Sequence, residues 1–198
     1  ALVVKGVAIQ EVPITWAWSW RGVKHLGGSW SVGTNVKLMR GDVFAKPIRV
    51  FDEDNDIGDQ VDEAWNNRET TNTVGVDVGV MGRYNLVQVG LMARNLNSPT
   101  FEGPSYIDSS GTKVDVDNVS AGPQVRAGVA LMPFSTLTLE GDVDLTRNQT
   151  MLEEYETQFA SLGFEWDALS VLALRAGAYK NLADDDIGSV YTAGLGLN

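Results

Sequence analysis

Apolar and polar residues alternate one by one through residues 72–97, with almost no turn between two runs. In the first run, Val74 to Val80, every second residue is valine, and glycine and aspartate lie between the valines. In the second run, Val87 to Ala93, aliphatic residues alternate with glutamine, glycine and methionine. A period of two predicts β-strands, and the short join at Tyr84-Asn85 predicts an antiparallel hairpin.

The same period recurs along the rest of the chain and predicts about ten strands in all. Residues 1–10 are expected to form a strand that stops near Pro13, and a second strand with alternating tryptophans is expected to follow it. The strand that begins at Trp30 is expected to continue past Gly41 toward Val50. Further alternating runs occupy residues 121–131, 137–145, 160–166, 172–179 and 187–198.

The connections between these runs alternate between short and long. The short ones lie at residues 22–28, 85, 133–135 and 167–169, and the long ones at residues 51–71, 98–118, 147–157 and 182–186. Most of the 26 acidic residues lie in the long connections. Alternate connections of an up-and-down sheet share one end, so one rim is expected to carry the acidic loops. Residues 51–71 are expected to be a long acidic extracellular loop, with a short helix around Asp59 to Trp65.

Long strands with one aliphatic and one polar face, joined by short turns at one end and long loops at the other, are typical of a membrane barrel. The predicted fold class is therefore all-β: an antiparallel up-and-down transmembrane β-barrel. Its polar face would line the lumen, where opposite charges can pair across strands. The residues expected to face the lumen are Lys37, Asp77, Arg83, Arg94, Arg126, Glu140, Asp142, Asp144, Glu165 and Arg175.

A soluble β-sandwich with its aliphatic face turned inward would give the same alternation. The barrel is favoured by strands longer than the about five or six residues common in soluble domains, by the unequal connections, and by charges dispersed among glycines. Aromatic residues also gather near the short-turn rim, as in the aromatic girdle of a membrane barrel. These residues are Trp18, Trp20, Trp30, Tyr84, Phe134 and Trp166.

Composition excludes several classes of function. The 198 residues include no cysteine and one histidine, His25, which excludes disulfides, thiolate metal sites and multi-histidine metal sites. The net charge of −11 disfavours nucleic acid as a partner, because phosphate binding requires clustered lysine and arginine. No run approaches the about 18 apolar residues that a membrane helix needs.

One acidic segment has the ligand spacing of a calcium loop. Asp52, Asp54 and Asp56 occupy positions 1, 3 and 5 of such a loop, and Glu63 occupies position 12. Ca²⁺ prefers several oxygen ligands on a tight turn, but the glycine comes one position late, at Gly58. A solvated acidic loop is the alternative interpretation, and no other cofactor is expected.

The carboxylates of Glu140, Asp142 and Asp144 share one face of a predicted strand. Two such groups can act as general acid and base, but no nucleophile or pocket is predicted beside them. Pairing with Arg126 on the neighbouring strand is the expected role. An enzyme is therefore not expected, and no catalytic residue is assigned.

Several segments are familiar: LVVKGVAIQEVP at 2–13, VKLMRGDVF at 36–44, GLMARNLNSPTF at 90–101, PQVRAGVALMPF at 123–134 and LRAGAYKNLADDDIGSVYTAGLGL at 174–197. Together they resemble the TraF-like (conjugal transfer) outer-membrane β-barrel family, which is distantly similar to barrels of the long-chain fatty-acid transporter type. The resemblance implies a location in the outer membrane of a Gram-negative bacterium. Compared with a complete member, residues 1–198 are expected to form a single barrel domain that lacks an N-terminal signal, early strands and C-terminal strands.

Three functions are consistent with this sequence. A porin-like channel or transporter would pass a small solute, including a hydrophobic one, through the lumen. A structural, assembly or conjugation-associated barrel would use its acidic loops to bind cations or a partner. A soluble β-sandwich would be a binding module. For either barrel, the expected partners are the lipid bilayer and its lipopolysaccharide, and the sequence specifies neither the solute nor a protein partner.

Overall fold

The computed structural model describes residues 2–22, 27–48, 58, 62, 65–108, 110–149, 155–168, 171–184 and 186–197. The longer strands are β1 (Leu2–Arg21), β2 (Ser29–Ile48), β3 (Glu69–Tyr84), β4 (Val87–Arg94), β9 (Gln124–Phe134), β10 (Leu137–Asp144), β13 (Phe159–Ala168), β14 (Leu172–Asn181) and β15 (Val190–Leu197). The short strands are β5 (Thr100–Phe101), β6 (Ser105–Ile107), β7 (Lys113–Asp115), β8 (Val119–Ser120), β11 (Asn148–Gln149) and β12 (Glu156–Thr157).

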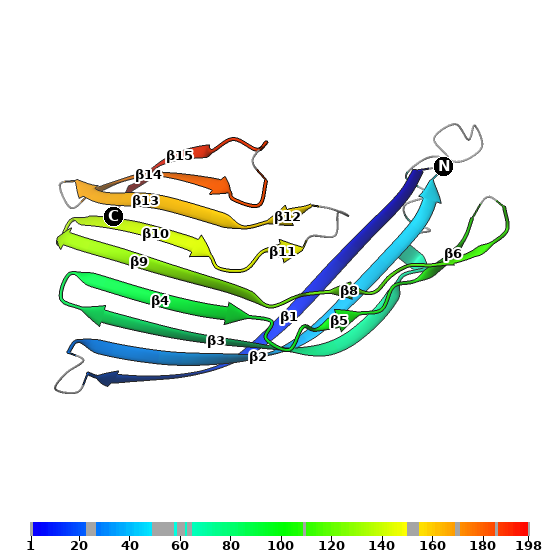
Figure 1. Cartoon of the computed structure of the whole chain (residues 1–198), viewed down its shortest axis with the longest axis horizontal. Coiled ribbons are helices and arrows are strands. Elements are labelled where there is room, and N and C mark those ends of the chain that lie inside the picture. Colours follow the sequence, from blue (N-terminus) through cyan, green and yellow to red (C-terminus); the bar gives the residue numbers. More distant parts are fainter. Residues whose placement is uncertain are drawn as a thin grey trace. The chain divides into compact units, whose positions relative to one another are not determined.

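The longer strands form one nine-stranded sheet in the order β1-β2-β3-β4-β9-β10-β13-β14-β15 (Figure 1). Each pair from β3 to β15 is antiparallel, which confirms the antiparallel all-β prediction. Three two-stranded ribbons, β5–β8, β6–β7 and β11–β12, occupy the long connections. Among the described strands the sheet is open, with β1 and β15 at its edges, and these strands form no closed barrel.

Strand β1 runs without a break through Pro13, so the prediction of two separate strands, 1–10 and 14–21, is wrong. Proline has no N–H to donate to a neighbour, and sheets tolerate it at an edge. Since β1 is an edge strand, Pro13 does not need to end it. The prediction that the second strand passes Gly41 is confirmed, because β2 ends at Ile48. Gly58, Asp62, Trp65 and Asn66 are helical, in the region where the sequence predicts a short helix.

The chain divides into two compact units. Unit 1 comprises residues 1–14, 36–75 and 98–121, and unit 2 comprises residues 15–35, 76–97 and 122–198. Strands β1, β2 and β3 contribute residues to both units. The two units bury their side chains in opposite ways, and each is described separately below.

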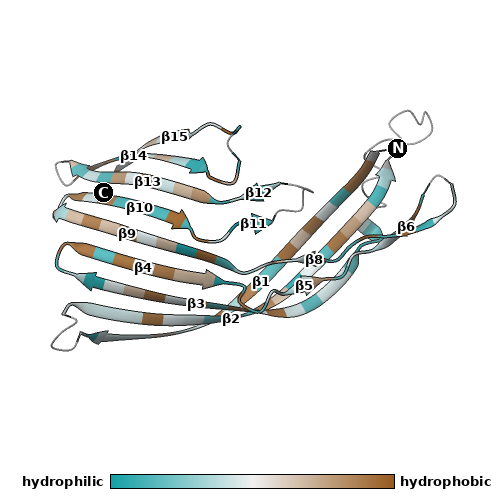
Figure 2. Cartoon of the chain, viewed as in Figure 1, coloured by the Kyte–Doolittle hydropathy of each residue, from teal (hydrophilic) through white to brown (hydrophobic). Residues whose placement is uncertain are grey.

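In unit 2 the strand register divides the side chains between two faces of the sheet. Directly paired residues share a face, as Leu91 does with Ala127, and Ala127 with Val143. The apolar face so defined consists of Val78, Val80, Gly82, Tyr84, Val87, Val89, Leu91, Ala93, Val125, Ala127, Val129, Leu131, Phe134, Leu137, Leu139, Gly141, Val143, Ala160, Leu162, Phe164, Trp166, Ala168, Leu172, Leu174, Ala176, Ala178, Lys180, Tyr191, Ala193, Leu195 and Leu197. Figure 2 shows hydrophobic and hydrophilic positions alternating along these strands.

The apolar face of unit 2 is exposed rather than packed into a core. Val129 is 51% exposed, Leu162 71% and Leu195 78%. The buried apolar side chains in the part of unit 2 that the structure describes are two alanines, Ala168 and Ala173. A soluble sandwich would bury such a face, because large exposed apolar patches mark contact with a membrane or a partner.

Unit 1 has a conventional buried core. Phe101 is fully buried and packs with Met39 and Val43 of β2. Val7, Val119 and Ala121 pack against this cluster. The ring of Phe101 lies where a Cβ on Gly41 would be, so glycine at position 41 is what lets the ring approach the strand.

Hydrogen bonds join the segments of unit 1 that surround this core. The Asp42 carboxylate accepts hydrogen bonds from the Thr70 hydroxyl at 2.5 Å and from Arg68 Nε at 3.3 Å. The Glu102 N–H donates to the Thr71 hydroxyl at 2.9 Å, which attaches the 98–121 segment to β3. Residues far apart in the sequence therefore form unit 1 as a small folded body.

The β6–β7 turn contains a carboxylate whose protonation is expected to weaken the turn. The Ser110 hydroxyl and the backbone N–H groups of Ser110 and Thr112 donate to the carboxylate and hold the pKa of Asp108 below its usual value. Because the folded-state pKa is depressed, this stabilisation is complete above the unfolded pKa and is lost as the pH falls through the folded pKa, below about pH 4. A carboxyl NMR titration of Asp108, with amide exchange at Ser110 and Thr112, measures the effect. Asp108→Asn is expected to remove this pH dependence, and a wild-type turn equally protected at every pH would contradict the prediction.

Candidate functional site

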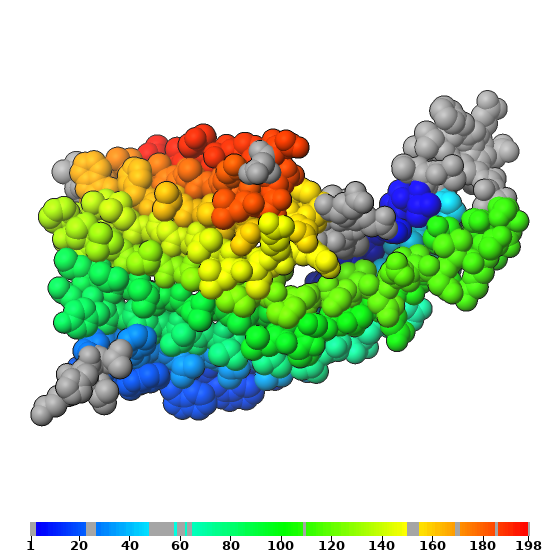
Figure 3. Space-filling model, in the orientation of Figure 1, coloured from blue at the N-terminus to red at the C-terminus, as the bar shows by residue number. Residues whose placement is uncertain are grey.

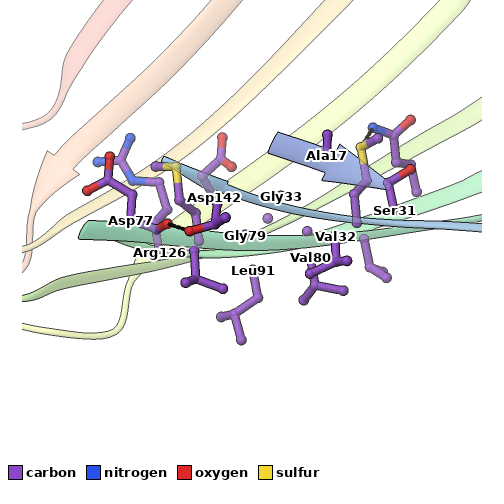
Figure 4. Close-up of a pocket in the computed structure, with 18 of the residues that line it drawn as sticks. Ala17, Ser31, Val32, Gly33, Asp77, Gly79, Val80, Leu91, Arg126 and Asp142 are labelled. Atoms are coloured by element: carbon purple, nitrogen blue, oxygen red, sulfur yellow. Dashed lines mark hydrogen bonds between the residues drawn. The ribbon is translucent and has the colours of Figure 1, made fainter. Parts of the chain in front are cut away.

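A pocket of about 560 Å³ lies over the polar face of unit 2 (Figure 4). The polar face is the opposite side of the β3–β15 strands and carries Asp77, Gly79, Met81, Arg83, Gln88, Gly90, Met92, Arg94, Arg126, Gly128, Glu140, Asp142, Asp144, Ser161, Gly163, Glu165, Arg175 and Thr192. Strands β1 and β2 complete the pocket with Thr15, Ala17, Ser31, Gly33 and Asn35. In Figure 4 the charged residues Asp77, Arg126 and Asp142 group together, apart from Ala17 and Ser31.

Glycines and methionines form much of the pocket. Gly90 pairs directly with Gly128 across β4 and β9, and Met81 pairs with Gly90 across β3 and β4. A Cβ at Gly90 would meet only the Val80 carbonyl, 4.0 Å away, so the space above Gly90 stays open to a solute. The Gln88 side-chain amide lies 2.8 Å from the sulfur of Met81. Methionine is flexible and apolar, and Met81 and Met92 therefore give this part of the pocket an adaptable apolar lining.

Asp77 is held firmly at the charged end. Its carboxylate accepts a hydrogen bond from the Asn95 N–H at 2.9 Å and lies 3.4 Å from the Asn35 amide nitrogen. The Thr34 hydroxyl donates to the Asp77 backbone carbonyl at 2.9 Å. The side chain is 6% exposed. These contacts tie β2 to β3 and anchor the turn after β4, so Asp77 has a structural role as well as lining the pocket.

An ion pair crosses from β9 to β10 next to the pocket. Arg126 Nε donates to the Asp144 carboxylate at 2.7 Å, and the Phe159 N–H donates to the same carboxylate at 2.9 Å. Of the three carboxylates that the sequence places beside Arg126, Asp144 is the one that bonds to it. Asp142 lies 3.4 Å from the Ser161 hydroxyl and leans over Gly128.

A second pocket, of about 530 Å³, lies over β10, β13, β14 and β15 on the same polar face. Glu165 and Arg175, which are directly paired across β13 and β14, form an ion pair in it. Glu140 lines both pockets and leans over Gly163. The polar face is thus hollowed along much of its width and carries charges of both signs.

The structure brings most of the residues predicted to face a lumen onto this polar face. Arg83 and Arg94 lie on it outside the first pocket. Lys37 lies elsewhere, in unit 1, where its side chain is 3% exposed and lies 3.6 Å from Glu11. The predicted calcium ligands, Asp52, Asp54, Asp56 and Glu63, lie outside the described residues. Within the described ranges, no group of three or more side chains is placed to hold a metal ion.

The charged positions alone did not reveal the apolar part of the pocket. Met81 and Met92 were recognisable as members of an alternating strand, but nothing local to them indicated a cavity. Thr15 and Asn35, which bond to each other at 2.7 Å, were also missed. Their contribution depends on the placement of β1 and β2 beside β3, and strand order is a property of the whole sheet.

A family comparison matches residues 1–144 to the model described as "F plasmid transfer operon, TraF, protein". The chain belongs to this TraF family. The resemblance to TraF-like proteins is therefore confirmed, whereas the similarity to fatty-acid transporter barrels stays a prediction. No curated protein matches the TraF-family chain.

Among solved structures, the TraF-family chain is similar to the toluene transporter TbuX of Ralstonia pickettii. The TM-score is 0.59 and the sequence identity is 11%, over 96% of this chain and 59% of TbuX. The two proteins thus share a fold, and this chain spans little more than half the length of TbuX. Neither comparison names an enzymatic activity, and no described helix of this chain is long and apolar enough to span a membrane.

Proposed function

We propose that the TraF-family chain contributes to a β-barrel in a bacterial outer membrane, and that this barrel passes a small, mainly apolar solute along its polar face. The observation that carries the proposal is that unit 2 exposes its apolar side chains, whereas a soluble protein would bury them. Aliphatic and aromatic side chains are exposed on one face, while ion pairs and glycines occupy the other. A bilayer covers an apolar outer face, and a barrel lumen accepts charges.

Aromatic residues at the ends of the strands indicate which rim of this barrel faces the periplasm. Tyr84, Phe134 and Trp166 lie on the apolar face next to the short turns, and they are 64%, 68% and 48% exposed. Trp18 and Trp20 lie near the end of β1, at the same rim. Amphipathic rings favour the interface between lipid and water. The short-turn rim is therefore the periplasmic edge in this proposal, and the β11–β12 ribbon of unit 2, in a long connection, lies on the extracellular side.

The pocket lining supports a solute with a mainly apolar body. Glycine backbone, Met81 and Met92 offer apolar contact, while Asp77, Asp142 and Arg126 offer polar contact at one end. The similar fold of TbuX, named as a toluene transporter, agrees with a small hydrophobic solute. The two pockets on the polar face have volumes of about 560 and 530 Å³, which lie within the range usual for small-molecule sites.

A structural or conjugation-associated barrel is the second candidate. It is favoured by the family description, which names a plasmid transfer operon, and by the separate folded core of unit 1. In that case unit 1 and its acidic connections would bind a partner or cations outside the membrane. The soluble binding module is the third candidate, and it requires that something other than lipid covers the apolar face.

Reconstitution in lipid vesicles distinguishes the candidates. The channel predicts that the chain inserts, and that single-channel recordings and liposome swelling detect passage of ions or small neutral solutes. Insertion without passage would favour the structural barrel. A chain that is monodisperse in buffer without detergent would contradict both barrels.

Filling the first pocket is expected to block passage without disturbing the sheet. A Cβ at Gly90 would meet only the Val80 carbonyl, 4.0 Å away, so a Gly90→Phe ring can project over the pocket. Liposome swelling should fall close to the protein-free rate. Gly188→Phe adds the same ring where a Cβ meets nothing within 4 Å and outside the pocket, and it should swell like wild type. Equal rates for the two variants would remove the pocket from the solute path.

A further inference from the structure

The two pockets on the polar face of unit 2 meet at one side chain. Residues of β1 to β4, β9 and β10 line the first pocket, and residues of β10, β13, β14 and β15 line the second. Among the described residues, Glu140 of β10 is the one that both linings share. A solute in either pocket therefore meets the same carboxylate.

The strand register surrounds Glu140 with small residues. Direct pairing defines a row across the polar face that consists of Gln88, Ala130, Glu140, Gly163, Gly177 and Thr192. Between the two ends of this row, Glu140 has the one side chain larger than a methyl group. A Cβ at Gly163 would lie 3.0 Å from a Glu140 carboxylate oxygen. Glycine at position 163 therefore lets the carboxylate lie along the wall, where it meets a solute without filling the pocket.

No neighbouring cation compensates the charge of Glu140. In the part of the chain that the structure describes, its carboxylate has no hydrogen-bond or ion-pair partner. The ion pairs of the polar face are formed by other carboxylates, since Arg126 pairs with Asp144 and Arg175 pairs with Glu165. Both pockets therefore share a full negative charge at Glu140.

The other carboxylates of the first pocket are less available to a solute. Asp77 is 6% exposed and accepts a hydrogen bond from the Asn95 N–H. Asp142 groups with Arg126 in Figure 4. Glu140, in contrast, is exposed. It is therefore the carboxylate that can act most directly on a passing solute.

We propose that Glu140 selects solutes by charge, so that uncharged and cationic solutes pass along the polar face and anionic solutes, such as carboxylates, are held back. The proposal rests on the channel described above and deepens it by naming the class of solute that the channel accepts. Of the arginines on the polar face, Arg83 and Arg94 line neither pocket. A solute in the pockets is thus closer to Glu140 than to these two positive charges.

Reversal potentials of the reconstituted chain in planar bilayers test this role of Glu140. Gradients of KCl, benzylammonium chloride and potassium benzoate are used, because benzylammonium and benzoate share a ring and have opposite charges. A unit charge a few ångströms from the path is expected to favour a monovalent cation over a monovalent anion about tenfold at low salt. Glu140→Gln should therefore lower the ratio of cation to anion permeability about tenfold. Ala130→Glu, which places a second carboxylate directly opposite Glu140, should raise the ratio.

Glu102→Gln is the matched control, because it removes the same charge at an exposed position in unit 1. It should keep the wild-type ratio. The role of Glu140 is overturned if Glu140→Gln keeps the wild-type ratio, if Glu102→Gln lowers the ratio as much, or if Ala130→Glu leaves it unchanged. A wild-type chain that conducts without preferring cations would overturn the role of Glu140 alone. A wild-type chain that inserts without any current would overturn the channel as well.

Discussion

Leu91→Arg is expected to prevent stable insertion into vesicles, whereas Met92→Arg is expected to insert like wild type. The two residues are neighbours in β4, and each is 44% exposed. Leu91 lies on the apolar face, opposite Val80 and Ala127, while Met92 lies on the polar face, opposite Gly79 and Arg126. Arginine on the lipid side costs about 2–4 kcal/mol near the bilayer centre, but a lumen accepts it.

Because Leu91 and Met92 are equally exposed, a difference between the two variants can be assigned to the face on which each residue lies. In a soluble protein with both faces in water, two neighbouring side chains of equal exposure would tolerate arginine equally. The measurement is the fraction of each variant that folds into vesicles, followed by protease protection and by the mobility shift of folded protein on gels. If Leu91→Arg and Met92→Arg inserted with the same yield, the apolar face would not be a lipid-facing surface.

Phe101→Ala is expected to lower the free energy of unfolding of unit 1 by about 3–5 kcal/mol. Phe101 is fully buried, and its removal leaves a cavity between Met39 and Val43 that the strands cannot close. Hydrogen exchange measured by mass spectrometry should show faster exchange in residues 36–48 and 98–121, with unit 2 unchanged. Ile107→Ala, at a position 66% exposed in the same unit, is the control and should exchange like wild type.

A second substitution tests whether Phe101 acts through its contact with Gly41. A Cβ at position 41 overlaps the ring of Phe101, so Gly41→Ala should destabilise the wild-type core. In the Phe101→Ala background the same methyl group enters empty space and should cost much less. Such non-additivity is the signature of two residues in contact. Additive effects would show that Gly41 and Phe101 act independently.

The alternation of residues 72–97 was enough to predict the β3–β4 hairpin and its two faces, because period two is a local property. The predicted end of the first strand near Pro13 is wrong, because an edge strand such as β1 tolerates proline and no local pattern shows which strand lies at the edge. The choice of Asp144 over Asp142 as partner of Arg126 likewise depends on register, since Arg126 lies directly opposite Asp144.

Lys37 shows most clearly what local patterns miss. Positions 31, 33, 35 and 37 of β2 share one period, so the sequence assigns them all to one polar face. Ser31 and Asn35 do line the polar pocket, but at Lys37 and Met39 the same series is buried in unit 1. The buried core there is completed by Phe101 and Val119, which lie more than fifty residues away in the sequence.

The strand order also determines how the sheet can assemble. Most neighbouring strands are close in sequence, so hairpins such as β9–β10 and β13–β14 can form early, with little loss of chain entropy. The pairing of β4 with β9 spans the longest connection in the sheet, from Arg94 to Gln124, and closing a longer loop costs more entropy. That connection supplies Phe101 to the core of unit 1. Formation of that core would therefore shorten the loop to be closed and hasten the joining of the two halves of the sheet.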